Sequence, residues 1–374
     1  MLRIFKHLLK LQSRHLLFVD LPSRMMRSIK PIKMRELLVF THQIARLLKA
    51  GIPLLSILQL LKSTTKNTSL THYIQKLIVN LEEGFSLSEA LEGNKLYFNQ
   101  FYCSLIALGE RTATLGLMFD RIAVYQEKNM KLRSKITNAL VYPLVVLSVA
   151  ILVFIALLMG VVPQFEQFFS EVGAQLPFIT RIIIYLSKNI GYISFTFGFL
   201  VSMIVIIFVF LKKKYSDVSN KLDSFYLKIP IIHKIISEII IARITRALST
   251  ALAAGLPLVD ALQLVADLSG NFVYKKAILK SCLLIRDGEC FYAAFSHQKL
   301  FPSDLLALIK VGEVGHCLVE ILNNTADLYE EKINYFAENL SVLLEPILII
   351  FLGLMISCLI IAMYLPIFKL GSII

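Results

Sequence analysis

The sequence predicts an all-α membrane protein in which two homologous helical-bundle domains alternate with three transmembrane helices. Three observations lead to this fold class. The 374 residues are 56% hydrophobic and 17% charged, with a mean hydropathy of +0.70, whereas soluble domains are about half apolar and a quarter charged. Three uncharged stretches are long enough to cross a bilayer, and one short phrase occurs twice in matching surroundings.

The uncharged stretches predict the membrane spans. They are Ala139–Val162, Ile190–Leu211 and Pro346–Phe368, of 24, 22 and 23 residues. A helix needs about 20 apolar residues to cross the hydrocarbon core of a bilayer. A buried helix of a soluble domain normally carries a polar stripe, which these stretches lack. All three are therefore expected to span the membrane.

The distribution of Lys and Arg predicts how the spans face. Residues 1–138 carry 21 Lys and Arg against 9 Asp and Glu, and residues 164–189 carry two of each. Three lysines directly follow the second span, at 212–214. Because Lys and Arg are enriched in cytoplasmic segments, the N-terminus and residues 212–340 are expected in the cytoplasm. The net charge of +13 is then mostly membrane-proximal, and no aromatic-basic module accompanies it, so nucleic acid is not expected as a partner.

A repeated phrase indicates that the two cytoplasmic segments are related. "LLKAGIPL" and "ALAAGLPL" place Gly51 and Gly255 at an offset of 255 − 51 = 204. The apolar helical face before the phrase matches at that offset, as do residues 54–67 and 258–271 after it. Gly51 and Gly255 can end one helix, and Pro53 and Pro257 can open the next.

Beyond a one-residue deletion the offset becomes 203. "LIALGE" ends at Glu110 and "LIKVGE" ends at Glu313. Pro143 near the start of the first span then meets Pro346 at the start of the third, 346 − 143 = 203. The repeat unit is therefore a helical domain followed by a span that begins near a proline, which can kink the helix where it enters the bilayer.

Turn signals such as "AGIP", "TTKNTS" and "EEGFS" divide the first copy into helices. These are expected at 36–50, 54–65, 70–82, 86–92, 98–108 and 115–134, the last running on into the first span. The whole chain then divides as follows: a basic amphipathic leader (1–35), cytoplasmic helical domain 1 (36–138), the first span (139–163), a periplasmic loop (164–189), the second span (190–211), cytoplasmic helical domain 2 (212–341), the third span (342–368) and a periplasmic tail (369–374). The leader suits a helix on an anionic membrane surface, although docking to a partner and disorder are equally open.

At this point the sequence resembles a known family over about residues 36–368. Two GE-containing helical domains, three spans and a repeated "AG-apolar-PL" turn are similar to the platform proteins of bacterial type II secretion systems and type IV pilus machines. The loop "VVPQFEQFFSEVGAQLPFITRIIIYLS" at 161–187 fits the family's "VP-x-F", Gly, "LP" and Thr pattern. The lead-in "KPIKMRELLVFTHQIARLL" at 30–48 looks most like the pilus branch.

The resemblance implies a multi-pass scaffold in the inner membrane, with no catalytic residues and no cofactor. Its implied partners are a hexameric cytoplasmic ATPase, pilin or pseudopilin subunits, other inner-membrane components, membrane lipids and further copies of the chain. Pilus assembly is the leading reading. A type II secretion system or a competence pseudopilus remains the alternative.

The chain departs from the family at the turn after GE. The family often has Ser-Gly two residues later, where this chain has Thr112-Ala113 and Gly315-His316. The turn therefore need not have the same geometry in both copies. The second domain is also closer to neutral, so the two domains need not bind the same partner surface.

The repeated residues are the candidate sites. We expect an interhelical turn to be shaped in each copy by glycine and proline, at Gly51, Pro53, Gly255 and Pro257. The alternative interpretation is that these residues contact the ATPase. In the GE pairs, Gly109-Glu110 and Gly312-Glu313, glycine is expected to end one helix while the carboxylate favours the dipole of the next. Because the pair occurs in both copies, it is also the best candidate for a coupling surface.

Two further carboxylates, Glu127 and Glu345, are candidate sites. Some secretion-branch relatives bind a cation through acidic residues near the end of the last cytoplasmic helix, and Glu127 is the nearest position here. No metal is expected, because Lys131 lies one turn later and can pair with Glu127. Glu345, beside Pro346, lies where the third span begins and must face water or pair with a cation such as Lys135. Glu345 either holds the spans together or engages a pilin, or it is simply an interfacial carboxylate.

Other function classes find little support. The chain has no GxxxxGK[ST], HExxH, GxSxG or GxGxxG motif, so an enzyme is not expected. The spans carry only scattered hydroxyls and no charge, which disfavours a transporter, although an oligomeric one remains a distant alternative. The five cysteines form no CxxC pair and are expected to be reduced.

Overall fold

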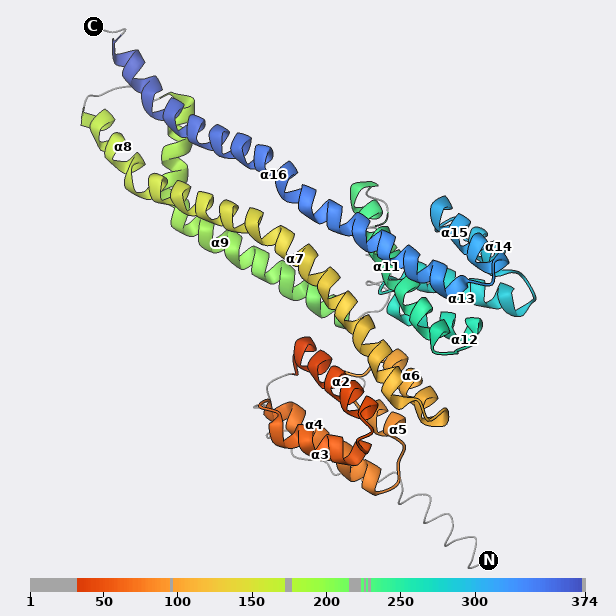
Figure 1. The fold of residues 1–374 in the computed structure, drawn as a ribbon. Coiled ribbons are helices and arrows are strands. Elements are labelled where there is room, and N and C mark those ends of the chain that lie inside the picture. The colour runs from red at the N-terminus through yellow and green to blue at the C-terminus, as the bar shows by residue number, and fades with distance from the viewer. Residues whose placement is uncertain are drawn as a thin grey trace, which may run out of the picture. The chain divides into compact units, whose positions relative to one another are not determined.

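The computed structural model describes residues 32–94, 97–171, 177–214, 223–224, 227 and 230–371, and all regular structure within them is α-helical (Figure 1). The predicted all-α fold is confirmed. Almost all of the expected leader and the last three residues of the expected tail lie outside the described residues. The chain divides into two units, residues 1–124 and 125–374, which are taken in turn.

The first unit contains the helices predicted for the first copy. They are α2 (Met34–Lys49), α3 (Leu54–Thr64), α4 (Thr68–Glu82), α5 (Leu87–Glu92), α6 (Gln100–Arg111) and the start of α7 (Leu115–Gly160). The ends match the prediction within about three residues, because local capping groups set them. The Asn67 side chain accepts hydrogen bonds from the backbone N–H groups of Ser69 and Leu70, and Ser86 forms a capping box with Glu89.

The second unit contains the second copy of the helical domain. Its helices are α11 (Pro230–Ala253), α12 (Leu258–Leu268), α13 (Phe272–Arg286), α14 (Phe291–Ser296), α15 (Ser303–Val314) and α16 (Leu318–Gly371). The register of the repeat holds at the level of single caps. Asn271, 204 positions after Asn67, accepts from the N–H groups of Val273 and Tyr274 at the start of α13.

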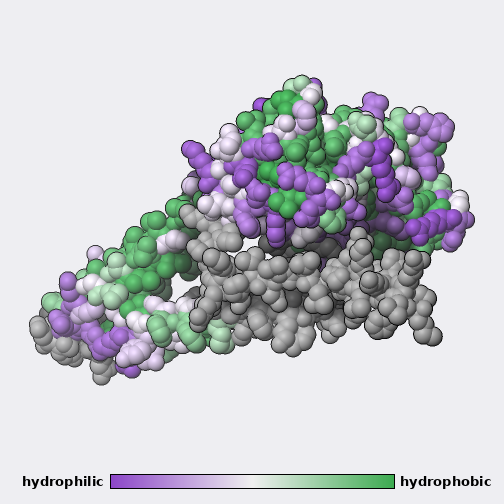
Figure 2. Space-filling model, turned by 90° about the horizontal axis from the view of Figure 1, so that it is seen from below, coloured by the Kyte–Doolittle hydropathy of each residue, from purple (hydrophilic) through white to green (hydrophobic). Residues whose placement is uncertain are grey.

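Two helices of the second unit are long and apolar enough to cross a membrane, among the residues that the structure describes. They are α7 and α16, which continue without a break from the helical domains through Pro143 and Pro346. Helix α9 (Phe178–Lys214) bends by 52° between its segments Phe178–Tyr192 and Ser194–Leu200. If these two segments are counted together as one span, the described residues contain three spans. In Figure 2 green, apolar surface lies on the middle of the left-hand arm, and the outer end of the arm is purple and white.

The segment expected as a periplasmic loop is largely helical. Helix α8 (Val162–Glu171) and the first turns of α9 occupy it. The N-terminal half of α9 packs on the ends of α7 and α16, in a cluster of buried side chains: Leu158, Val162, Ile183, Ile184, Leu359 and Ala362. Thr180 donates a hydrogen bond to the carbonyl oxygen of Ala362 (2.7 Å), so a polar side chain there finds an internal partner.

Candidate functional site

The repeated "AG-apolar-PL" phrase forms the same turn in both copies. Gly51 has φ +79° and Gly255 has φ +94°. In the first copy the N–H groups of Gly51 and Ile52 bond to the carbonyl oxygens of Leu48 (3.0 Å) and Leu47 (3.1 Å), which is a Schellman C-cap. Pro53 and Pro257 lie at the N-caps of α3 and α12. The phrase thus shapes an interhelical turn, the first of its two readings.

The glycine of each GE pair permits close packing of two consecutive helices. Gly109 lies within α6 and Gly312 within α15. A Cβ atom on Gly109 would lie 2.7 Å from Met118 Cγ, and one on Gly312 would lie 3.1 Å from Ile321 Cβ. The expectation that these glycines end their helices is therefore wrong. Glycine is needed at each position because a side chain there would push the crossing helix away.

The glutamate of each pair caps a short helix that precedes it in the sequence. Glu110 Oε1 accepts from the N–H of Leu87 (2.5 Å), and Oε2 accepts from the N–H (3.2 Å) and Oγ (2.7 Å) of Ser88 at the start of α5. Glu313 accepts from the N–H groups of Phe291 (2.6 Å) and Tyr292 (3.0 Å) at the start of α14. The sequence predicts that each glutamate interacts with the N-terminus of the following helix, whereas in the structure it interacts with the N-terminus of a preceding helix.

The residues that directly follow the C-caps of α6 and α15 are non-glycine residues in the strained left-handed conformation. Ala113 and His316 both have φ +54°, and they occupy equivalent places in the repeat, 316 − 113 = 203. In each copy the next N–H closes the turn onto the carbonyl of the GE glycine, from Thr114 (2.8 Å) and from Cys317 (3.0 Å). The turn therefore has one geometry in both copies, despite the different residues.

Substituting His316→Gly is expected to stabilise the second repeat by about 0.5–1 kcal/mol. The left-handed conformation costs a non-glycine residue ~1–2 kcal/mol. Glycine removes this cost but also increases the conformational entropy of the unfolded chain, which offsets part of the stabilisation. Thermal unfolding of the purified chain in detergent measures the change. Substituting Gly315→Ala, one residue earlier where φ is −81°, is the contrasting variant. A destabilised His316→Gly chain would contradict the assignment of strain.

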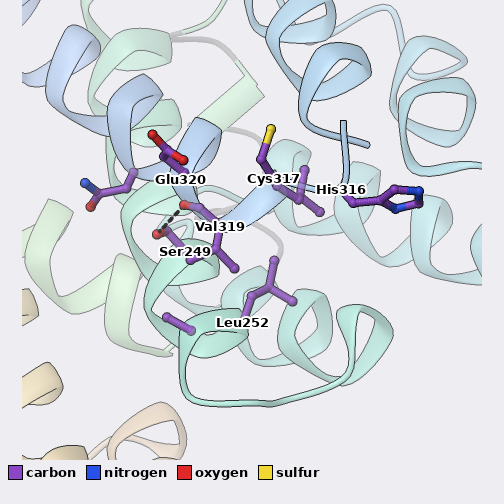
Figure 3. Close-up of a pocket in the computed structure, with 9 residues that line it drawn as sticks. Ser249, Leu252, His316, Cys317, Val319 and Glu320 are labelled. Carbon is purple, nitrogen blue, oxygen red and sulfur yellow. Dashed lines mark hydrogen bonds between the residues drawn. The ribbon is translucent and has the colours of Figure 1, made fainter. Parts of the chain in front are cut away.

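In the second repeat a surface groove brings the two repeated motifs together. It has a volume of 790 Å³ and lies between the end of α11 and the start of α16 (Figure 3). Leu252, beside the AG turn, and His316 and Cys317, beside the GE pair, line it. Ser249 Oγ donates to the Val319 carbonyl oxygen (3.0 Å) along one side.

An ion pair bridges the equivalent region of the first repeat. Lys49 Nζ lies 2.8 Å from Asp120 Oδ2, where the second repeat has alanine and asparagine. Gly116, in the place of Val319, lets the chain approach Leu48, since a Cβ there would lie 3.3 Å from Leu48 Cβ. The two repeats thus share a scaffold but differ at this corner.

An ion cluster around the buried Arg246, which the sequence pattern did not predict, joins three helices of the second unit. The Arg246 side chain on α11 is 7% exposed, and its Nη2 lies 2.5 Å from Asp327 Oδ1 and 2.9 Å from Glu330 Oε1 on α16. Arg246 Nη1 donates to Asn323 Oδ1 (2.5 Å). Lys128 Nζ on α7 lies 2.9 Å from Asp327 Oδ1. The cluster therefore ties the helix that enters the first span to the helix that enters the third.

One signal for this cluster was present in the sequence. Asn323, Asp327 and Glu330 have the i, i+4, i+7 spacing of one helical face. Arg246 lies in the middle of the otherwise apolar pattern of α11. A charge at a core position, opposite an acidic face, indicates a buried pair.

The cluster shifts the pKa values of its members. Burial raises the pKa of the Asp327 carboxyl, but hydrogen bonds from Lys128 and Arg246 outweigh it and hold that pKa below its ordinary value. The hydrogen bond to Asp327 raises the pKa of Lys128 above its ordinary value. Asp304 has a lowered pKa too: burial raises it, but hydrogen bonds, first among them that from Lys332, outweigh burial.

These shifts predict an acid-sensitive second repeat. The stability contributed by Asp327 is present above its unfolded pKa of about 4 and is lost as the pH falls through the lower folded value. The contribution of Lys128 is fully present below its unfolded pKa of about 10.5. The melting temperature should thus be flat between about pH 5 and 9 and fall below about pH 4. In Asp327→Asn the melting temperature should fall less steeply at acid pH than in the wild type. An equally steep fall would contradict the role given to Asp327.

The remaining predicted residues lie apart from these groups. Glu127 Oε1 pairs with Lys131 Nζ (2.7 Å), as expected. Among the described residues no group of three His, Cys, Asp or Glu side chains is placed to hold a metal ion. Glu345 is exposed on α16, and within the described residues it has no ion pair with Lys135 or another cation.

Comparison with known proteins gives a match to both repeats. The family described as "Type II secretion system (T2SS), protein F" matches residues 40–163 and 244–366. The two matched segments start 244 − 40 = 204 and end 366 − 163 = 203 positions apart, which are the offsets found in the sequence.

Individual relatives cover most of the chain. The type IV pilus assembly protein PilC of Pseudomonas aeruginosa is 35% identical over 92% of both chains. The type IV pilus assembly protein TapC of Aeromonas hydrophila is 34% identical over 92% of this chain and 83% of its own length. The type II secretion system protein F of Vibrio cholerae is 26% identical over 90% of this chain and 83% of its own length.

Proposed function

The chain belongs to the family of type II secretion system protein F and type IV pilus assembly protein PilC, and from this membership we propose that it is the inner-membrane platform of a type IV pilus assembly machine. The platform proteins of this family are not enzymes, and the spanning helices and the family together indicate the inner membrane. The observation that carries the pilus assignment is the identity: 34–35% to the two pilus proteins against 26% to the Vibrio secretion protein.

As a platform the chain would transmit force rather than transform a substrate. A hexameric cytoplasmic ATPase would bind the helical domains, and pilin subunits would be lifted from the membrane beside the spans, with other inner-membrane components and further copies of the chain around them. The continuous helices α7 and α16 support this role, because a helix without a flexible joint moves its span when its cytoplasmic end moves. The excess of Lys and Arg before the first span supports a cytoplasmic N-terminus.

An in-frame deletion, complemented in trans, tests this function. Surface filaments are counted by electron microscopy, and secreted proteins are compared in the same cultures. Loss of filaments with an unchanged secretome is the expected result. Intact filaments with missing secreted proteins would transfer the chain to the secretion branch, which the matched family's description makes the second candidate. If neither changed while both machines were active, the assembly role would be refuted.

Glu345 is a candidate contact for the pilin. It is exposed on α16 directly before Pro346. An exposed carboxylate where a span begins can attract a positively charged group of an incoming subunit. Full complementation of the deletion by Glu345→Gln would remove this role and leave the platform assignment standing.

A further inference from the structure

The first segment of α9, Phe178–Tyr192, has a buried face and an exposed aromatic face. The buried side chains have the i, i+3, i+4, i+7 spacing of one side of a helix: Thr180, Ile183, Ile184 and Ser187. On the opposite side three aromatic side chains follow one another at intervals of seven residues. This aromatic stripe consists of Phe178 (78% exposed), Tyr185 (68%) and Tyr192 (79%).

The buried face fixes the segment across two of the long apolar helices. Thr180 Oγ1 donates a hydrogen bond to the carbonyl oxygen of Ala362 on α16 (2.7 Å). Ser187 Oγ donates one to the carbonyl oxygen of Leu158 on α7 (2.5 Å). One hydroxyl is thus bonded to each helix, and this determines which face of the segment points away from the protein.

These contacts lie close to the end of both apolar helices. Leu158 is 162 − 158 = 4 residues before the end of the first uncharged stretch, and Ala362 is 368 − 362 = 6 residues before the end of the third. At a rise of about 1.5 Å per residue, the distances along the helices are ~6 Å and ~9 Å. Amphipathic helices in a bilayer interface lie at this level, about 5–10 Å into the boundary between headgroups and acyl chains.

The segment is not needed to cross the bilayer. The chain bends by 52° between Phe178–Tyr192 and Ser194–Leu200, so the two parts of α9 run in different directions (Figure 1). The uncharged stretch Ile190–Leu211 is long enough to span by itself. Arg181 and Lys188 are exposed on the first segment, and a charge at the centre of a bilayer is costly.

The exposed face changes from aliphatic to charged across its width. Ile179 and Ile182 are exposed on one side of the aromatic stripe, and Arg181 and Lys188 lie on the other side. Lys188 Nζ pairs with Glu166 Oε1 on α8 (2.5 Å). Aliphatic side chains suit acyl chains, aromatic rings favour the headgroup level, and Lys and Arg reach towards water and phosphate. The order of side chains is therefore the order of chemistry across a bilayer interface.

We propose that the exposed face of Phe178–Tyr192 binds the lipid bilayer interface. Its aromatic stripe lies at headgroup level, with Ile179 and Ile182 towards the acyl chains and Arg181 towards the lipid phosphates. The face continues along the chain into the second span, whose exposed side chains Phe195 and Phe199 contact lipid. The proposal goes beyond the proposed function and holds for either machine. It makes a segment expected as a loop into a membrane-binding element.

A second copy of the chain is a poorer occupant of this face. Residues 178–192 contain no Asp or Glu. Two copies packed through this face would therefore bring like charges together, which costs free energy. Lipid phosphates supply the opposite charge.

Tryptophan fluorescence tests the proposal, because the chain has no tryptophan of its own. The full chain with Tyr185→Trp is reconstituted in vesicles of phosphatidylcholine and phosphatidylglycerol. Acyl chains brominated near the headgroup or near the chain end report depth, and acrylamide reports contact with water. Phe199→Trp is the control for hydrocarbon, since Phe199 lies ~14 Å beyond Ile190 along the helix. Phe85→Trp, at an exposed position of the first unit, is the control for water.

The expected result is that shallow bromines quench Tyr185→Trp at least about twofold more than deep ones. Phe199→Trp should show the reverse order, and Phe85→Trp should be quenched by acrylamide alone. Tyr192→Trp, on the same stripe, should reproduce the pattern of Tyr185→Trp, which separates the position of the face from a local distortion.

Three results would overturn the proposal. Quenching of Tyr185→Trp and Tyr192→Trp by acrylamide without quenching by bromine would place the face in water. Strongest quenching by deep bromines would make the segment part of a span. Quenching by neither would make a protein, such as a second copy of the chain, the occupant. None of these results changes the assignment to pilus assembly, which the deletion experiment tests separately.

Discussion

Replacing Arg246 by methionine is expected to destabilise the second repeat by about 3–5 kcal/mol, because it removes the charge that compensates two partly buried carboxylates. Asp327 and Glu330 would keep their desolvation cost without their main partner. The guanidinium is almost fully buried, with bonds to three acceptors on α16. The melting temperature of the purified chain in detergent should fall by roughly 10 °C or more.

Lys128→Met is the matched control for the same cluster. The Lys128 side chain is 39% exposed, so water screens its charge and can solvate Asp327 when it is gone. A cost of about 1 kcal/mol or less is expected. The triple variant Arg246→Met/Asp327→Leu/Glu330→Met should recover most of the stability, since an apolar replacement of a whole buried cluster is often neutral. Equal effects of Arg246→Met and Lys128→Met would contradict the description of the cluster.

Glu313→Ala is expected to cost about 2–3 kcal/mol, because it leaves the N–H groups of Phe291 and Tyr292 without an acceptor at a partly buried helix start. The N-cap of α14, Cys290, makes no side-chain hydrogen bond to the helix. Glu110→Ala should cost less, about 1–2 kcal/mol, because the Ser86 capping box still holds one N–H of α5.

Hydrogen exchange of the 287–296 peptide measures this prediction directly. In Glu313→Ala the amides of Phe291 and Tyr292 should exchange faster, whereas in Glu331→Gln, an exposed carboxylate on α16, they should be unchanged. Fast exchange of both amides already in the wild type would show that the carboxylate does not cap α14.

Features set by local pattern could be predicted from the sequence. The helices of the first repeat follow from turn signals, and the Schellman turn at Gly51 follows from glycine and proline at a fixed spacing. The spans follow from the absence of charge. The repeat offsets located the equivalent residues of the second copy, and the two Asn caps confirm that register.

Features set by tertiary contact could not be predicted in this way. Glu110 caps a helix that begins 23 residues earlier, and no local spacing reports such a contact. Gly109 was expected at a helix end because glycine favours C-caps, but Met118 on the crossing helix explains it. The Arg246 cluster joins three helices that are distant in sequence.

The central claim is that the helical domains act on the spans through unbroken helices, and replacing four exposed residues of α7 tests it most directly. Ser134, Lys135, Thr137 and Asn138 are changed together to glycine, which costs helix stability of about 1 kcal/mol per residue relative to alanine. The same four positions changed to alanine give the matched control with the helix intact.

Surface filaments are then counted in the deletion strain complemented with each variant, at matched membrane levels and matched ATPase binding. The account predicts filament numbers near wild type for the alanine variant and few or none for the glycine variant. Wild-type filament numbers with the glycine variant would contradict it, because a flexible joint would then separate the helical domain from its span without consequence.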